Sequence, residues 1–192
     1  ILGTPHVQKE RHIDSADFTV IGSGAIGESI SPAGDVDGDG LDDFLFASTS
    51  YQYYGSNPNG RVHLMMGSSI GPHTSISIES TDYKFVSGYD WNLGLQVSTA
   101  GDVDGDGLDD ILFGSSASDI TGQNTGSAYL MLGSTISNSF ATWFDMETDA
   151  DYKMYGAFSS DYLAKQLAPA GDIDGDGMDD FMIGASGNDY AG

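Results

Sequence analysis

The 192-residue sequence predicts an all-β fold built from three similar four-stranded units. Three observations lead to this prediction. A segment with the pattern Ala-Gly-Asp-x-Asp-Gly-Asp-Gly-x-Asp-Asp begins at Ala33 and returns at Ala100 and Ala170, at offsets of 67 and 70 residues. Short apolar runs bounded by turn residues recur at matching positions around each copy. No segment combines a helical period with a cap, so long helices are not expected.

The four strands of a unit are expected in a fixed order around the acidic loop. The first strand precedes the loop and contains Ile26-Gly27, Leu93-Gly94 or Leu163-Ala164. The second strand follows the loop, as Phe44–Ala47, Ile111–Gly114 and Phe181–Gly184. The third strand is Gly60–Gly67 in one unit and Gly126–Gly133 in the next. The fourth strand is Asp82–Phe85, Asp151–Met154 and, more loosely, Asp17–Val20.

The second strand of each unit indicates how the units are arranged. It is apolar at consecutive residues, which is typical of a strand that is buried on both faces of its sheet. A small sheet covered by a neighbour on each side is a blade of a β-propeller. The sequence therefore predicts propeller blades, and a β-sandwich with metal-binding loops is the alternative.

The chain is predicted to form a single domain, residues 1–192, with repeats at about 1–66, 67–132 and 133–192. In this alignment Ile1–Thr4 matches Met131–Ser134, so both ends of the chain fall within the third strand of a unit. We interpret this frame as a partial propeller, or as a ring that a second copy closes. Two copies would supply six blades, so a two-fold homodimer is expected, with Ile1–Gly3 beside the partner's last sheet near Phe181–Gly184.

The charge of the chain is strongly negative. Its 29 acidic and 6 basic side chains give a net charge of −23. This balance excludes a nucleic-acid partner, whose phosphates need Lys and Arg, and no apolar stretch is long enough for membrane insertion. Each acidic loop holds five Asp, so the loops account for 15 of the acids, and three bound Ca²⁺ ions would bring the charge to −17. The absence of Cys excludes disulfides and thiolate metal sites, and it is compatible with a secreted protein.

The spacing of the loop acids predicts calcium binding. Ca²⁺ takes six to eight oxygen ligands in flexible geometry. Asp at positions 1, 3 and 5 would present three carboxylates to one ion, and Gly at position 6 allows the sharp reversal that follows. The carbonyl of residue 7 and the carboxylate of residue 9 would complete the site, while the Asp at position 8 (Asp42, Asp109 and Asp179) is expected to point away from it. The expected ligands, for three Ca²⁺ per chain, are Asp35, Asp37, Asp39, Leu41 and Asp43; Asp102, Asp104, Asp106, Leu108 and Asp110; and Asp172, Asp174, Asp176, Met178 and Asp180.

Two other motifs could account for parts of this sequence. An EF-hand needs a bidentate Glu at position 12 of its loop and flanking helices, but position 12 here is Phe46, Phe113 or Ile183 within an apolar strand. A strand followed by the GxGxxG pattern of Gly22–Gly27 suggests dinucleotide binding, which also requires a helix directly after the glycines. Only four residues separate Gly27 from Pro32, so no such helix fits.

These residues resemble the FG-GAP repeats of integrin-α-like β-propellers. The "FG" pair of that family corresponds to Ile26-Gly27, Leu93-Gly94 and Leu163-Ala164, and its calcium loop matches all three acidic loops. Its "GAP" end corresponds to Ala47–Thr49, Gly114–Ser116 and Gly184–Ser186, each without the proline. The resemblance implies β-propeller blades, an extracellular or cell-surface location, and a role in adhesion or as an accessory domain of a secreted enzyme.

Three functions follow as hypotheses. The first is an extracellular calcium-binding module for adhesion or for interaction with a protein or glycan, and the aromatic loop around Tyr51, Tyr53 and Tyr54 is the candidate contact. Trp143 is expected in a loop between blades. The second is an accessory or catalytic propeller fragment of a secreted hydrolase or polysaccharide lyase. The third is a structural spacer. The chain has only two Arg, Arg11 and Arg61, and no paired His, so no catalytic residues are assigned and an enzyme is not expected.

Overall fold

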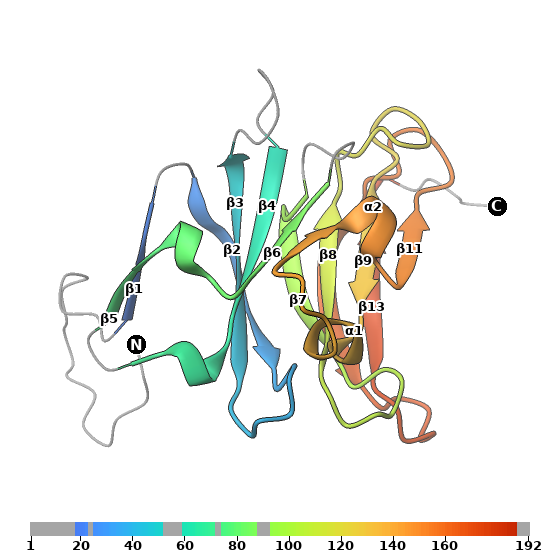
Figure 1. Cartoon of the computed structure of the whole chain (residues 1–192). Helices are drawn as coiled ribbons and strands as arrows, with labels where there is room; N and C mark the ends of the chain where they lie inside the picture. Colours follow the sequence, from blue (N-terminus) through green and yellow to red (C-terminus); the bar gives the residue numbers. More distant parts are fainter. Residues whose placement is uncertain (1–17, 23–24, 52–58, 72–73, 88–92, 188–192) are drawn as a thin grey trace, which may run out of the picture.

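Figure 1 shows the protein as a computed structural model, which describes residues 18–22, 25–51, 59–71, 74–87 and 93–187. Within these residues the chain is mostly β, with two short α-helices, α1 (Gly133–Ser137) and α2 (Met146–Asp149). Two short 3₁₀ turns, η2 (Gly67–Ser69) and η3 (Ile78–Ser80), follow the fourth and fifth strands of the chain. The predicted all-β class is confirmed.

The four-stranded unit predicted from the sequence is present twice. The first sheet contains β2 (Ile26–Gly34), β3 (Asp43–Tyr51), β4 (Asn59–Met65) and β6 (Tyr83–Val86), each antiparallel to its neighbours. The second sheet contains β7 (Gln96–Gly101), β8 (Asp110–Ser115), β9 (Ser127–Met131) and β11 (Tyr152–Tyr155) in the same arrangement. The first two strands of the third unit form a sheet of their own, β12 (Leu163–Gly171) and β13 (Asp180–Ala185).

Each unit also lends a short strand to the sheet before it, which the sequence did not predict. β10 (Trp143–Asp145) lies between β9 and β11 in the chain but pairs in parallel with β6 of the first sheet. β5 (Thr74–Ser77) lies between β4 and β6 and pairs in parallel with β1 (Phe18–Ile21). β1 pairs with β5 in the same parallel manner as β6 pairs with β10. β1 therefore occupies the position of a fourth strand, as the loose match of Asp17–Val20 to Asp82–Phe85 predicted.

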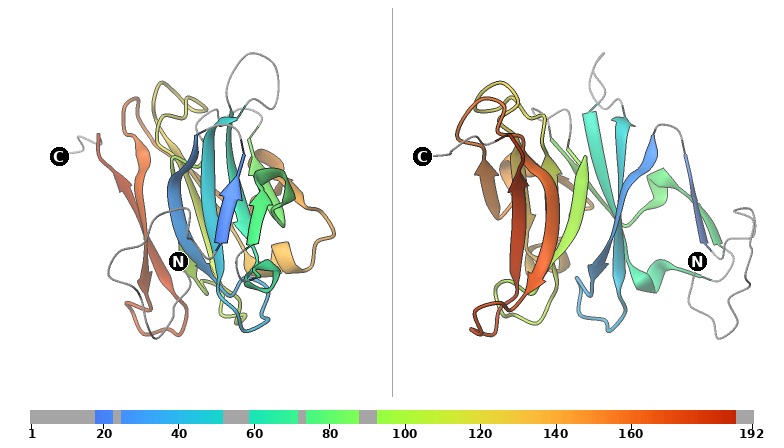
Figure 2. Two further views of the ribbon diagram at one scale, coloured as in Figure 1. Left: turned by 90° about the vertical axis from the view of Figure 1, so that its left-hand side faces the viewer. Right: turned by 180° about the vertical axis from the view of Figure 1, so that it is seen from behind.

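The sheets stack face to face, and Figure 2 shows them side by side in its right-hand view. The innermost strand of the second sheet, β7, contacts both β2 and β12. On β8, Ile111 and Phe113 join the apolar cluster shared with the first sheet, where Phe113 lies 4.8 Å from Phe85 between ring centroids. Leu112, between them, joins the cluster shared with the third sheet. The prediction that this strand is buried on both faces is therefore confirmed, and the stacked blades form a partial propeller.

The third sheet differs in having one bare face. Met182 of β13 occupies the position of Leu112, but 55% of it is exposed, whereas Leu112 is fully buried. Ile173, in the loop before β13, is 69% exposed. No further sheet covers this face among the residues that the structure describes. The division into repeats at 66 and 132 and the homodimer stay predictions.

Candidate metal centres

The three acidic loops occupy equivalent places in the fold. Each joins the first and second strands of a sheet, and the strands close on it in the same register, with Gly34, Gly101 and Gly171 opposite Asp43, Asp110 and Asp180. Figure 1 and the right-hand view of Figure 2 show the three loops at the same, lower end of the sheets. Stacking of the blades thus brings the three loops into a row.

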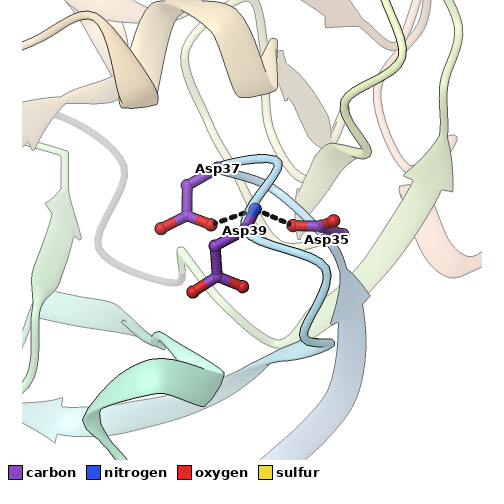
Figure 3. Close-up of side chains that lie close together, drawn as sticks. All are labelled: Asp35, Asp37 and Asp39. Carbon is purple, nitrogen blue, oxygen red and sulfur yellow. Dashed lines mark hydrogen bonds between the residues drawn. The ribbon is translucent and has the colours of Figure 1, made fainter.

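The first Asp of each loop organises the backbone around it. In the first loop the Asp35 carboxylate accepts hydrogen bonds from the amides of Gly38 at 2.8 Å, Asp39 at 3.0 Å and Gly40 at 2.9 Å. Figure 3 shows the bond from the Asp39 amide, which also donates to Asp37. Asp102 and Asp172 accept the corresponding three hydrogen bonds in their loops, at 2.7–3.1 Å. At the sixth position Gly40 has a φ of +85°, which side chains with a Cβ rarely adopt. The three loops therefore share one conformation.

Carboxylate oxygens converge in every loop. Three side chains in each loop bring an oxygen within 4.8 Å of the others, and these sets are Asp35, Asp37 and Asp39; Asp102, Asp104 and Asp110; and Asp172, Asp174 and Asp180. Two oxygens on opposite sides of a Ca²⁺ ion are about 4.6–5.2 Å apart, given Ca–O distances of about 2.3–2.6 Å. The separations fit one such ion per loop, and the all-oxygen donor set suits a hard cation.

The Asp at the fifth position belongs to the carboxylate set of the first loop alone. Asp106 and Asp176, at the fifth position, each accept a hydrogen bond from the amide two residues later, as Asp39 does from Leu41 at 2.8 Å. That contact occupies one carboxylate oxygen of Asp39. Ligation through the carbonyls of Leu41, Leu108 and Met178 stays a prediction.

The Asp at the ninth position ties the loop to its sheet. Asp43 is 2% exposed, and its two carboxylate oxygens accept hydrogen bonds from the amides of Val36 at 3.0 Å and Gly67 at 2.8 Å. Asp110 repeats this pattern with Val103 and Gly133, each at 2.8 Å. Burial raises the pKa of Asp43 and of Asp110 to about 6, although the two amides act in the opposite direction. Ligation of calcium through both oxygens stays a prediction for this position.

The Asp at the eighth position has a role that the sequence did not reveal. It was expected to be an outer acceptor or simply solvated, and Asp42 is indeed exposed. Asp109, however, lies against the first loop: its carboxylate accepts a hydrogen bond from the Asp35 amide at 2.8 Å, and its own amide donates to the Asp35 carbonyl at 3.1 Å. Asp179 makes the same two contacts with Asp102, at 3.2 and 2.8 Å. Desolvation raises the pKa of Asp109, with the neighbouring carboxylates adding to the effect.

Two other sequence features can be placed. The last glycine of the GxGxxG pattern, Gly27, lies within the strand β2 and is not followed by a helix, so the pattern does not form a dinucleotide site. His63 is fully buried, stacks on Phe46 at 5.0 Å between ring centroids, and lies 2.9 Å from the Thr81 hydroxyl through Nδ1. Burial lowers the pKa of His63 to about 3, with nearby Arg61 and Lys84 adding to the effect.

The sequence also led to predictions for Trp143 and for the aromatic loop around Tyr53 and Tyr54. The prediction that Trp143 lies in a loop is wrong: it lies in β10, the strand that extends the first sheet. The buried guanidinium of Arg61 lies 4.6 Å from its ring centroid. The predicted partner contact around Tyr53 and Tyr54 lies outside the described residues.

Stacked four-stranded sheets, each with an acidic loop between its first two strands, define a β-propeller repeat protein. Comparison with sequence models of protein families identifies the repeat: FG-GAP repeats are found at residues 27–65 and 93–131. Each match runs from the first strand of a sheet through the acidic loop to the third strand. The chain therefore carries FG-GAP repeats, which indicate an integrin-like β-propeller module.

The acidic loop at 172–180 lies outside the matched segments, but it has the conformation of the other two. No curated protein matches the chain. FG-GAP repeats are typical of extracellular or surface proteins. Among the described residues no helix has the length and apolar character needed to cross a membrane.

Proposed function

We propose that the chain is an extracellular calcium-binding module that binds three Ca²⁺ ions, one in each acidic loop. The observation that supports this most strongly is the repeated loop geometry, in which one Asp is held by three backbone amides while neighbouring carboxylates converge within 4.8 Å. Such a cluster carries several negative charges with no basic residue in the loop, so its carboxylates repel one another until a cation binds. Extracellular fluid supplies Ca²⁺ at concentrations that suit weak sites of this kind.

The bound ions would act structurally. Each would cross-link the turn between the first two strands of a blade and stiffen the row of loops at one end of the stack. This fixed surface would serve adhesion or the binding of a protein or glycan, and no catalytic role is proposed.

Calorimetry tests the calcium proposal. We expect three ions to bind per chain with dissociation constants on the order of 10⁻⁴–10⁻³ M, as in extracellular modules. A triple variant, Asp37→Ala with Asp104→Ala and Asp174→Ala, should lose this binding, whereas the control Asp42→Ala should keep it. Fewer than two ions bound to the wild-type chain would refute the proposal. A glycan array with and without Ca²⁺ would then separate a ligand-binding module from a spacer.

We also propose that a second copy covers the bare face of the β12–β13 sheet. In the second sheet the same face of β8 is covered by the third sheet, which buries Leu112. Met182, the equivalent residue of β13, is exposed. At the other end of the stack, β1 and β5 stand as the outer part of a blade, with Phe18 packed 5.8 Å from Phe44 between ring centroids. β12 and β13 of one copy, the first two strands of a blade, and β1 of another copy, in the position of a fourth strand, would belong to the same blade. Two copies would then close a six-bladed ring.

Light scattering in calcium buffer tests the ring. We expect a mass of two chains for the wild type and of one chain for Met182→Lys, since a charge on this face would be buried without a partner. Phe140→Lys is the control, because Phe140 is fully exposed and lies outside the three apolar clusters. A stable wild-type monomer would eliminate the ring without affecting the calcium proposal.

A further inference from the structure

Neighbouring acidic loops are joined by the same two-point contact at both internal junctions. At the first junction the Asp109 carboxylate accepts from the Asp35 amide and the Asp109 amide donates to the Asp35 carbonyl. At the second, Asp179 contacts the amide and carbonyl of Asp102 in the same way. In each case the Asp at the eighth position of one loop makes two hydrogen bonds to the backbone of the first Asp of the preceding loop.

The glycine that precedes the first Asp makes room for this contact. A Cβ placed on Gly34 would lie 2.1 Å from the nearer carboxylate oxygen of Asp109, and one on Gly101 would lie 2.1 Å from that of Asp179. At Gly171, where no following loop is present among the described residues, a Cβ would meet nothing within 4 Å. The space around this glycine is therefore set by the junction and not by its own loop.

The contact links the two carboxylate clusters through very few bonds. Asp35 belongs to the cluster of the first loop, and Asp110, which follows Asp109 directly, belongs to that of the second. An ion that fixes Asp110 would also restrict Asp109, and Asp109 holds the backbone of Asp35. Asp179 and Asp180 stand in the same relation to Asp102.

We propose that Asp109 and Asp179 are positioning residues that couple calcium binding between neighbouring loops, so that filling one loop raises the affinity of the loop before it. This inference rests on the proposed calcium binding. Coupling of this kind is reciprocal, because a first ion that orders a shared contact reduces the ordering cost for the second ion in either order of binding.

NMR can follow each loop separately during a calcium titration. The amides of Gly40, Gly107 and Gly177 each donate to the first Asp of their own loop, so each reports on one site. In the Asp109→Ala variant we expect the calcium midpoint reported by Gly40 to rise about tenfold or more, the equivalent of one lost hydrogen bond to a carboxylate. This change occurs in a loop that does not contain the substitution.

Two variants separate positioning from a simple loss of charge. Asp109→Asn keeps an oxygen that can accept from the Asp35 amide, so the Gly40 midpoint should return close to that of the wild type. A charge effect alone predicts that Asn and Ala behave alike. Asp42→Ala removes the same side chain from the first loop, where it contacts no other loop among the described residues, so the midpoints of Gly107 and Gly177 should not move.

The second junction gives an independent test if Asp109→Ala fails to fold. Asp179→Ala should raise the midpoint of Gly107 more than that of Gly40, because it acts on the first loop only through the occupancy of the second. The proposal is overturned if all three loops bind calcium and neither Ala variant moves the midpoint of the preceding loop. If no glycine amide of the wild-type chain responds to calcium, both the coupling and the proposed function are wrong.

Discussion

Substitution of Asp43 by Asn is predicted to change how the stability of the calcium-free protein depends on pH. The side chain is 2% exposed, and burial raises its pKa from 3.8 to about 6. Between these two values the folded state holds a proton on Asp43 that the unfolded state has released. The free energy of unfolding therefore falls as the pH rises through this window, and it levels off above pH 6.

The size of the effect follows from the shift. About two pKa units at about 1.4 kcal/mol each correspond to a loss on the order of 3 kcal/mol across the window. Asn cannot ionise, so Asp43→Asn should remove this contribution. The substitution should also lower the free energy of unfolding by an amount that does not depend on pH. The reason is that an amide side chain has one oxygen to accept from the Val36 and Gly67 amides, whereas the carboxylate has two.

Urea unfolding in EDTA between pH 4 and 7.5 measures the effect as a difference between the wild type and the variant. The difference cancels the many acidic residues common to both. Asp42→Asn is the matched control, because it makes the same chemical change at an exposed position next to Asp43. If the wild type and Asp43→Asn show parallel pH profiles, the assigned burial cost is wrong.

Three further predictions concern metal removal, the site and the core. Chelation should lower the melting temperature, since ions that bind only the folded state add about 2.7 kcal/mol per site at 100 times their dissociation constant; an unchanged melt in EDTA would contradict this. Asp43→Ala should weaken calcium binding at the first loop far more than Asp42→Ala does, and equal effects in calorimetry would overturn the ligand assignment. Leu112→Ala should cost about 2–5 kcal/mol in denaturant unfolding, whereas Met182→Ala should cost under about 1 kcal/mol in the monomer; similar losses would argue against the bare face.

Much of the fold could be predicted because its strands repeat. The acidic loop fixes the turn between the first two strands, and the consecutive apolar residues Ile111, Leu112 and Phe113 predict burial on both faces of the sheet. The structure confirms both. The shared conformation of the three loops likewise follows from identical spacing of Asp and Gly.

The short strands β5 and β10 could not be predicted for a physical reason. Each has four residues or fewer, and each is held by pairing with a strand that lies far away in the chain. Trp143 therefore appeared to lie in a loop. The contact of Asp109 was missed for the same reason, since its partner Asp35 is 74 residues away. An Asp at the eighth position of all three loops, which the ligand scheme did not use, was the one available signal.

The parallel pairing of β10 with β6 has a consequence for dividing this chain into parts. β10 is encoded within the second unit but completes the edge of the first sheet. Excision of residues 26–86 would expose β6 as an open edge that can recruit strands from other molecules. Excision of the second unit alone would leave β10 as a strand without a sheet. No single cut between the two units yields two complete pieces, so the blades are expected to be inherited, engineered and expressed together.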